Sequence, residues 1–402
     1  MTATATGTQS DRPRRFAFLT PEYPTELTGE GGVSSYVHKM AHLLASRGHD
    51  CTVFVVSREP GTLWDGPVKV VRVPRSRALP VRALTWVLRR FDPFGGYVVS
   101  QVATARLLAA ALEAEHAMAP FDVVQSANLQ VVGLYVRRRE GRRHLVRIST
   151  SRLLYDASYS RGATVLSRVL ELLDVRAQRR ADVTYAPSAF LQRYFSERYG
   201  LPVKVVRPPM PTDVSTRAAP PPGLPERYLV HYGMLGRRKG SDVIAEALPL
   251  AWERAPDLRM VWAGPLRESA LKRYSANWGE RVDQVTYLGP LDKPVLYGVV
   301  AGAVASVLPS RMDNLPNTVI ESLSLGVPVI GSDGASIDEL VAHGRSGLLV
   351  PIGDAAALAD AMVAVWQGRS FECVAPPDEM DPDRAVAALL EVAGVAPGTR
   401  LV

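Results

Sequence analysis

A run of prolines divides the chain just beyond its midpoint. Residues 207–225 read RPPMPTDVSTRAAPPPGLP. Proline fixes φ and has no backbone N–H, so this stretch cannot hold a helix or a central strand. A chain of 402 residues is also longer than one hydrophobic core usually supports. We therefore expect an N-terminal domain over residues 12–208, a linker over 209–225, a C-terminal domain over 226–375, and a tail over 376–402 that can pack back on the first domain.

Short apolar segments alternate with amphipathic segments on both sides of the prolines. Such alternation predicts a parallel sheet covered by helices on both faces, here once in each half. Ligands of such sheets bind outside the carboxyl ends of the strands, so we expect two doubly wound α/β domains facing a central cleft. The predicted strands are Phe16–Thr20, Cys51–Val56, Val70–Val73, Val123–Gln125, Leu145–Ile148, Val183–Pro187, Tyr228–Tyr232, Arg259–Ala263, Val285–Leu288, Ala305–Leu308 and Val327–Gly331.

The composition is that of an ordinary soluble globular protein, with 47% hydrophobic and 22% charged residues. The first eleven residues have no basic region followed by an apolar core, so we expect no secretory signal. The apolar run Val295–Leu308, about 14 residues long, is too short to cross a bilayer and should form a buried helix and strand. Cys51 and Cys373 form neither a disulfide framework nor a metal-ligand spacing, which suits the cytoplasm.

The net charge of +7 is unevenly distributed. Five of the seven residues from Arg137 to Arg143 are arginines, and more follow the pattern of a basic amphipathic helix around Leu84–Phe91. That helix either packs on its own domain or touches an anionic membrane surface, which leaves open a peripheral position at the inner membrane. The arginines are not interleaved with stacking aromatic residues, so we expect no nucleic-acid partner.

Two glycine-containing turns follow predicted strands. Residues 29–32 read GEGG and open the first helix, where glycine lets a phosphate approach free backbone amides. A structural turn would have the same composition, and that alternative stays open for Gly31 and Gly32. The second turn, Tyr232–Gly240, contains Gly233, Arg238 and Lys239, and its cations would suit a pyrophosphate. A solvated basic loop is the alternative.

A third segment, residues 310–333, reads SRMDNLPNTVIESLSLGVPVIGSD. Thr318–Glu321 fits a capping box, which predicts a helix over Val319–Leu325. The backbone amides of Asn314, Leu315, Asn317 and Thr318 could hold an anion. Carboxylates do not bind phosphate, so Asp313 and Glu321 should instead face hydroxyl groups of a sugar and a ribose.

These segments resemble a known family. Asp313 and Glu321, separated by seven residues and followed by SLSLGVPVI, resemble the E-x7-E signature of retaining glycosyltransferase family 4, whose fold is the two-domain GT-B architecture. Further similarities, in the family's order, are Gly31–Val33 with Arg47–Asp50, Gly233 with Lys239–Gly240, Leu288–Gly289, Leu308–Ser310, Asp338–Leu340, Gly347–Val350 and Gly353–Asp354. The resemblance covers most of residues 16–365.

The resemblance implies a role for each matching residue. Glu321 would hold the ribose of a nucleotide, and Asp313 would hold hydroxyls of the donor sugar. Lys239 and Arg238 would neutralise the leaving diphosphate, so that no metal is required, and Gly32 would let the N-terminal loop close on it. Lys239, Arg238 and Asp313 are thus the candidate catalytic residues. The nucleotide sugar, of UDP or GDP type, is a substrate, and no cofactor is expected.

The sequence departs from the family pattern at three places. Where the family often has an arginine before the loop lysine, this chain has Gly233 or Met234, so Arg237 or Arg238 must substitute. Asp313 is one methylene shorter than the usual glutamate. The family's histidine after the fourth strand is absent from Val124–Asn128, and His49 and His231 are expected to be scaffold residues. We therefore assign no general base.

The mechanism and the partner are less constrained by the sequence. The family's front-face reaction, in which the leaving diphosphate takes the acceptor's proton, fits better than double displacement, for which Glu22 and Glu30 would be the candidate nucleophiles. The acceptor is a hydroxyl compound: a small natural product, a lipid-linked sugar or a polysaccharide, contacted through Trp86, Arg137–Arg143 or residues 152–161. Alternatives are an NADP-linked oxidoreductase, with Arg58 on the 2′-phosphate, and a catalytically silent sugar-nucleotide binding protein.

Overall fold

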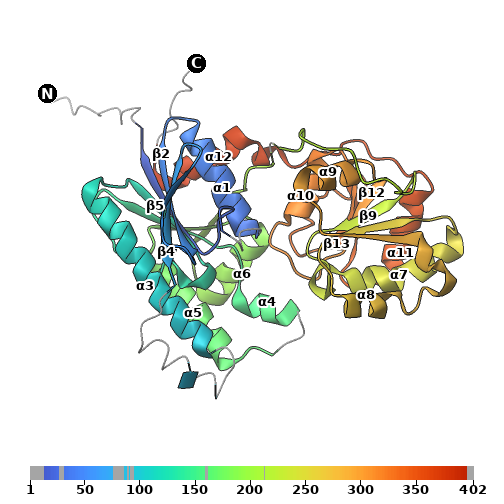
Figure 1. The fold of residues 1–402 in the computed structure, drawn as a ribbon, viewed down its shortest axis with the longest axis horizontal. Helices are drawn as coiled ribbons and strands as arrows, with labels where there is room; N and C mark the ends of the chain where they lie inside the picture. The colour runs from blue at the N-terminus through green and yellow to red at the C-terminus, as the bar shows by residue number, and fades with distance from the viewer. Residues whose placement is uncertain are drawn as a thin grey trace.

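Two α/β halves lie side by side in the computed structural model (Figure 1). The structure describes residues 13–26, 31–75, 86–87, 90, 95–158, 162–211 and 213–395. Each half is built on one sheet, of eight strands in the N-terminal half and six in the C-terminal half. The two-sheet α/β architecture predicted from the sequence is therefore confirmed.

The first sheet has the strand order β3-β4-β2-β1-β5-β6-β7-β8, and all its neighbours are parallel except the antiparallel edge pair β3 and β4. Its strands are β1 (Arg15–Thr20), β2 (Asp50–Ser57), β3 (Gly61–Asp65), β4 (Val68–Pro74), β5 (Val123–Ala127), β6 (Arg143–Arg147), β7 (Val183–Ala186) and β8 (Val203–Val205). The helices of this half are α1 (Gly32–Ala45), α3 (Gly95–Met118), α4 (Arg152–Ser158), α5 (Val165–Arg180) and α6 (Ala189–Tyr199), with a 3-10 turn η1 (Leu129–Val131).

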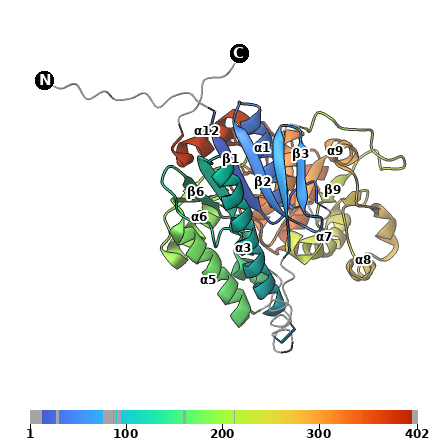
Figure 2. The ribbon, with the colours of Figure 1, turned by 60° about the vertical axis from the view of Figure 1, so that its left-hand side comes forward.

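Alternate residues of the central strands enter two separate cores. Phe16 and Phe18 of β1 pack with α1, whereas Ala17 and Leu19 pack with the apolar side of α3. Successive side chains of a strand point to opposite faces, so a strand that is apolar at every position must be covered on both sides. Figure 2 shows α3 crossing one face of this sheet while α1 lies on the other.

The second sheet is wholly parallel, with the order β11-β10-β9-β12-β13-β14. Its strands are β9 (Leu229–Tyr232), β10 (Met260–Ala263), β11 (Val285–Gly289), β12 (Ala305–Leu308), β13 (Val329–Asp333) and β14 (Gly347–Pro351). Its helices are α7 (Ser241–Arg254), α8 (Glu268–Ser275), α9 (Lys293–Ala301), α10 (Asn317–Ser324) and α11 (Ala355–Trp366), with 3-10 turns η2 (Arg237–Lys239), η3 (Gly279–Gln284) and η4 (Asp378–Met380). Helix α9 and strand β12 account for the apolar run of the sequence, as predicted.

The last helix, α12 (Pro382–Ala393), returns to the N-terminal half (Figure 1). Val386, Leu389 and Leu390 of α12 are buried in the same core as α1 and β1. On the way, the proline-rich segment contacts the returning chain, since the Met210 N–H donates to the Met380 carbonyl at 2.8 Å. The chain therefore passes twice between the halves. The domain limits at 208, 225 and 375 remain predictions.

One glutamate of the C-terminal half binds the start of a helix in the other half. The Glu339 carboxylate accepts the N–H groups of Ala189 and Phe190, in the first turn of α6, at 2.7 and 2.8 Å. It also pairs with Arg207 at 2.7 Å. A carboxylate at a helix N-terminus is stabilised by the free amides and by the partial positive charge there. Glu339 thus connects the halves through three charge-assisted hydrogen bonds.

Some predicted elements differ from the structure. The short strands β3, β8 and β14 were not predicted. Strand β13 begins two residues later than expected, and α10 begins at Asn317 instead of Val319. The helix expected around Leu84–Phe91 and the candidate Glu30 lie largely or wholly outside the described residues. Among the described helices, none combines the length and the apolar character that crossing a membrane requires.

Two buried histidines make the stability of the folded chain depend on pH. Burial lowers the pKa of both His144 and His231 to about 4, whereas an unfolded histidine titrates near about 6.5. The unfolded chain therefore binds more protons in this range. Their contribution to stability is complete above pH ~6.5 and is lost as the pH falls toward 4.

We therefore expect the urea midpoint of unfolding to fall as the pH is lowered from 7.5 to 4.5. His231 accounts for part of this fall, because its ring is fully buried between the Val307 carbonyl and Ser241 Oγ, each at 2.8 Å. His231→Gln should make the dependence on pH shallower, whatever it does to the midpoint at pH 7.5. Parallel curves for the two proteins would contradict the assignment. The hydrogen bonds confirm that His231 is a scaffold residue.

Candidate active site

The turn after β9 carries three cations beside glycines in special conformations. Gly233 and Gly240 have φ of +99° and +76°, and η2 lies between them. A Cβ on Gly240 would collide with the Pro309 carbonyl, so only glycine lets this turn lie against the segment that follows β12. The Arg311 N–H then donates to the Arg238 carbonyl at 2.9 Å. These contacts bring the cationic turn to the carboxyl ends of β9 and β12.

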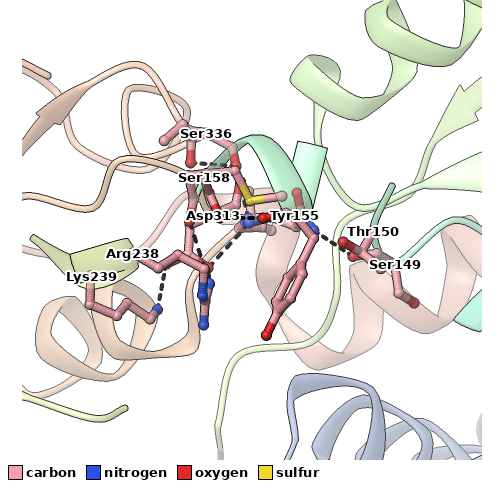
Figure 3. A network of polar contacts seen from close by, with 12 residues as sticks. Ser149, Thr150, Tyr155, Ser158, Arg238, Lys239, Asp313 and Ser336 are labelled. Atoms are coloured by element: carbon pink, nitrogen blue, oxygen red, sulfur yellow. Dashed lines mark hydrogen bonds and ion pairs between the residues drawn. The ribbon is translucent and has the colours of Figure 1, made fainter. Parts of the chain in front are cut away.

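Asp313 is the anionic centre of this region (Figure 3). Its carboxylate forms an ion pair and hydrogen bond with Lys239 Nζ, and its second oxygen lies 3.6 Å from Arg238 Nη1. Lys239 and Asp313 are both buried, each 8% exposed. Buried ions need partners to offset the lost hydration, and here the two supply each other. In this structure the Asp313 carboxylate pairs with the same two cations that were predicted to bind a diphosphate.

The segment from Asp313 into α10 is a strained turn. The Asn314 N–H donates to Asp313 Oδ1 at 3.2 Å, and Leu315, at φ +59°, donates its N–H to Ser336 Oγ at 2.8 Å. The amides of Asn314 and Leu315, predicted to face an anion, are therefore already paired here. The backbone N–H groups of Asn317 and Thr318, in the first turn of α10, have no acceptor among the described residues.

The capping-box interpretation of Glu321 is wrong. The N-cap of α10 is Pro316, with no side-chain cap, and Thr318 lies inside the helix. The Glu321 carboxyl instead accepts a hydrogen bond from the Tyr297 hydroxyl at 3.3 Å and lies 4.0 Å from Lys293 Nζ. Burial raises the pKa of Glu321, while the charges of Lys293 and Lys39 act in the opposite direction. Glu321 is thus a buried acceptor not needed to start the helix.

The two halves touch beside this network. Asn314 Nδ2 donates to the Ser149 carbonyl, after β6 of the other half, at 2.8 Å. The Gly32 position is also close to Asn317, because a Cβ built on Gly32 would lie 3.9 Å from Asn317 Nδ2. The N-terminus of α1 therefore approaches the start of α10. The carboxyl ends of both sheets meet here, as expected for a cleft between them.

Asn128 fixes the segment that receives Asn314. Its Nδ2 donates to the Thr150 carbonyl at 2.6 Å, and its Oδ1 accepts the Ser149 N–H at 2.7 Å. From the sequence alone, Val124–Asn128 was notable only for lacking a histidine, so this role of Asn128 was missed. Following the hydrogen bonds from Asn128 through Ser149 and Asn314 leads to Asp313 and Lys239.

Asn128→Ala is expected to lower kcat/KM of the transfer reaction that the family resemblance implies about tenfold, about 1.4 kcal/mol, because the segment at Ser149 loses its anchor. Steady-state kinetics of that reaction would measure the loss. Asn277→Ala, at an exposed asparagine of the C-terminal half, is the control and should be neutral. Equal kcat/KM for Asn128→Ala and the wild type would show that the contact between the halves is not used.

The N-terminal wall near this contact includes Glu22, Tyr97 and Arg152. Glu22 lies against Gly31, where a Cβ would collide with its carboxylate, and burial raises its pKa. Burial also raises the pKa of Tyr97, whereas the charges of Arg152 and Arg75 act to lower it. These groups therefore form one polar patch at the N-terminal side of the cleft.

The arginine run lies elsewhere. The run Arg137–Arg143 leads into β6 and includes its first residue, so it lies at the amino end of that strand, opposite the carboxyl ends that face the cleft. Arg139 and Arg142 both pair with Glu113 of α3, at 2.5 and 2.7 Å. The expectation that this run contacts an acceptor is therefore not supported. Of the other two proposed acceptor contacts, Trp86 is exposed, with 68% of its surface accessible, and residues 152–158 form α4, while residues 159–161 lie outside the described residues.

Most of the predicted site residues lie in one region. Lys239, Arg238 and Asp313 are in direct contact, and a Cβ on Gly233 would lie 2.9 Å from Thr318. The Tyr232 hydroxyl also donates to the Thr318 carbonyl at 2.6 Å. The cationic turn and the start of α10 therefore adjoin. The roles of the individual side chains remain predictions.

Two family descriptions match the chain in the same order as the two halves. Residues 30–214 match the family described as Glycosyltransferase Family 4, and residues 226–368 match Glycosyl transferases group 1. The chain belongs to glycosyltransferase family 4. The resemblance inferred from the sequence is thereby confirmed, and the family is one of glycosyltransferases, as the motifs predicted. These two matches leave the alternative of an NADP-linked oxidoreductase without support.

Individual relatives agree with this family 4 assignment. A D-inositol 3-phosphate glycosyltransferase of Pseudarthrobacter chlorophenolicus is 31% identical over 172 residues, 42% of this chain and 39% of that protein. The match thus spans less than half of that relative's length. Among solved structures, the sucrose-phosphate synthase of Thermosynechococcus elongatus has a TM-score of 0.69 at 19% identity, covering 94% of this chain and 96% of its own. Anabaena HepE, solved in complex with UDP and glucose, has a TM-score of 0.61 at 17% identity, covering 95% of each chain. These structures show the shared GT-B fold.

Proposed function

We propose that this family 4 chain is a retaining glycosyltransferase that moves a sugar from a nucleotide diphosphate sugar to a hydroxyl acceptor. The observation that carries the proposal is the meeting of Lys239, Arg238 and Asp313 beside the first turn of α10, at the edge that faces the other half. Paired cations and free helix amides suit a diphosphate, and the adjacent carboxylates suit hydroxyl groups.

Lys239 and Arg238 are the groups for the diphosphate. Before the donor binds, Asp313 keeps both cations in place and offsets one of their two positive charges. A diphosphate that enters beside them can take over the pairing, and Asp313 is then released toward the sugar. As the glycosidic bond breaks, negative charge grows on the diphosphate, and the two cations stabilise it in a site screened from water. On this proposal the transfer reaction requires no metal ion.

The sugar and the ribose need acceptors for their hydroxyl groups. Asn314 Oδ1 is buried and has no hydrogen-bond partner among the described residues, and it belongs to the residue after Asp313. A buried unpaired acceptor is costly, so a sugar hydroxyl that donates to it would bind favourably. Glu321 offers a second acceptor, which we assign to the ribose. The donor is of UDP or GDP type, and the neighbour solved with UDP favours UDP.

Retention is best explained by attack on the same face as the departing diphosphate. A double displacement would need an ionised carboxylate as nucleophile. The described candidate, Glu22, is half-buried, and its carboxylate lies against Gly31, while burial raises its pKa, which disfavours it as an anionic nucleophile. That supports the front-face reaction, in which the leaving diphosphate accepts the acceptor's proton.

The acceptor side is the patch of Glu22, Tyr97 and Arg152. We propose a small polyhydroxylated acceptor with an anionic group, since Arg152 and Arg75 both act on Tyr97 there. The D-inositol 3-phosphate named for the curated relative is a compound of this class. A lipid-linked sugar remains an alternative acceptor. A reducing cytoplasm suits the two free cysteines, Cys51 and Cys373.

A donor screen tests the proposed function. The purified chain is incubated with UDP- and GDP-sugars in the absence of acceptor, and mass spectrometry detects the released nucleotide diphosphate. We expect slow hydrolysis of one donor, accelerated when a phosphorylated polyol is added. A protein that binds a donor but releases nothing with any acceptor would instead be a silent sugar-nucleotide binding protein.

A further inference from the structure

Three side chains of the kinds that can bind a metal meet on the N-terminal half, and none of them pairs with Lys239 or Asp313. His38 and His42 lie one turn apart on α1, and Asp65 ends β3. One ligand atom from each lies within 4.8 Å of the others, and it is the one such group among the described residues. Histidines at i and i+4 share a helix face and can bind the same ion.

The distances in this cluster are close to those of a tetrahedral metal site. His38 Nε2 is 3.4 Å and His42 Nε2 is 3.8 Å from Asp65 Oδ2. In a tetrahedral zinc site with bonds of about 2.0–2.1 Å, neighbouring ligand atoms are about 3.3 Å apart. The two nitrogen–oxygen distances are therefore within about 0.5 Å of the tetrahedral value.

Surrounding groups orient the three side chains. His42 Nδ1 lies 3.0 Å from the His38 carbonyl, so a proton on Nδ1 leaves the Nε2 lone pair toward Asp65. The Tyr23 hydroxyl donates to Asp65 Oδ2 at 2.7 Å. Ligating histidines and carboxylates in metal sites are usually held by such outer hydrogen bonds. Gly66, at φ +55°, follows Asp65, and a Cβ there would lie 3.6 Å from His42 Nε2.

A simple histidine–aspartate ion pair explains this arrangement less well. The two imidazole rings lie 4.2 Å apart between centroids, so protonating both would place two positive charges together. Both Nε2 atoms lie near the same oxygen, Asp65 Oδ2, so one ion bound between the three groups would contact all of them.

We propose that His38, His42 and Asp65 form a binding site for a divalent transition-metal ion of the zinc class. Two imidazoles and one carboxylate are ligands that zinc prefers, and a fourth position stays open to water because the side chains are 26–38% exposed. The ion links α1 to the β3–β4 hairpin, and α1 carries Gly32 at the cleft. Lys39 and Lys293 also face His38 and oppose a cation, so the affinity is moderate.

Metal titration of the untagged, chelator-treated chain tests the site without any sugar nucleotide, so its outcome is separate from that of the donor screen. We expect one Zn²⁺ per chain by calorimetry, a rise in Tm with Zn²⁺, and intense visible absorption with Co²⁺, as tetrahedral coordination produces. Removing a ligand should cost more affinity than removing an outer hydrogen bond. We expect a loss of more than about 100-fold in His42→Ala and Asp65→Asn, and of about tenfold in Tyr23→Phe.

Matched controls keep the result interpretable. Asp65→Asn retains an oxygen that can accept the Tyr23 hydroxyl, so it should fold, which circular dichroism and the Tm of the metal-free protein would verify. His343→Ala, at an exposed histidine of the C-terminal half, should bind Zn²⁺ like the wild type. The proposal is overturned if no saturable binding near one equivalent is found, or if His42→Ala and Asp65→Asn bind as tightly as the wild type.

Discussion

Lys239→Ala is expected to lower the turnover of sugar transfer by a factor on the order of 10²–10³, about 3–4 kcal/mol, as removal of a preorganised charge does in other enzymes. The reason is the position of Lys239 Nζ in the buried network with Asp313, beside the free amides of α10. Arg238 remains near Asp313, so the carboxylate keeps a partner and the fold should persist. The loss should fall mainly on kcat, because the charge on the diphosphate grows in the transition state.

Steady-state kinetics and circular dichroism of Lys239→Ala would measure turnover and folding together. Lys272→Ala is the control, because Lys272 is an exposed lysine on α8 that pairs with Glu268 one turn away. It should have the turnover of the wild type. A Lys239→Ala protein that transfers sugar at the wild-type rate would refute the proposed role of the cationic turn.

Glu321→Gln is expected to lower kcat/KM for the donor about 100-fold, roughly 3 kcal/mol, mostly through KM. The buried carboxylate can accept two ribose hydroxyls in charge-assisted hydrogen bonds, each of which contributes about 1.5–3 kcal/mol, whereas a glutamine offers one neutral acceptor. The change is nearly isosteric, and the Tyr297 hydroxyl can still donate to the remaining oxygen. Folding should therefore be little affected.

A deoxy donor separates ribose binding from a general effect of Glu321. The wild type should discriminate strongly against a nucleotide sugar that lacks a ribose hydroxyl, and Glu321→Gln should discriminate much less. Glu246→Gln, at an exposed glutamate on α7, serves as the control and should discriminate like the wild type. If Glu321→Gln keeps the full discrimination, the ribose is bound by other groups.

The sheets could be predicted because their central strands are apolar at successive positions. Strands such as β1 and β2 are buried on both faces, so most of their residues are apolar and the strands can be recognised from the sequence. The edge strand β3 could not be found in the same way. Its sequence, GTLWD, is mostly exposed, and it becomes a strand only by pairing with β4. Its hydrogen bonds, and not its composition, define it.

The site was predictable where it depends on local sequence. The cationic turn and the start of α10 each follow a strand, and parallel strands place such turns at one edge. The contacts of Asn314 with Ser149, 165 residues away, and of Asn128 with Ser149 depend on how the halves and loops meet. The cluster of His38, His42 and Asp65 also depends on a contact between separate segments of the chain, since the third ligand comes from the unpredicted β3. For this reason no metal site could be predicted from the sequence.

Glu339 determines how the halves can separate. It holds two amides of α6 and the guanidinium of Arg207, all at 2.7–2.8 Å, whereas Asn314 and Ser149 share one uncharged hydrogen bond. Charge-assisted hydrogen bonds are about twice as strong as neutral ones, so separating the halves at Asn314 costs less than separating them at Glu339. We therefore expect any movement of the halves on substrate binding to break the Asn314 contact first.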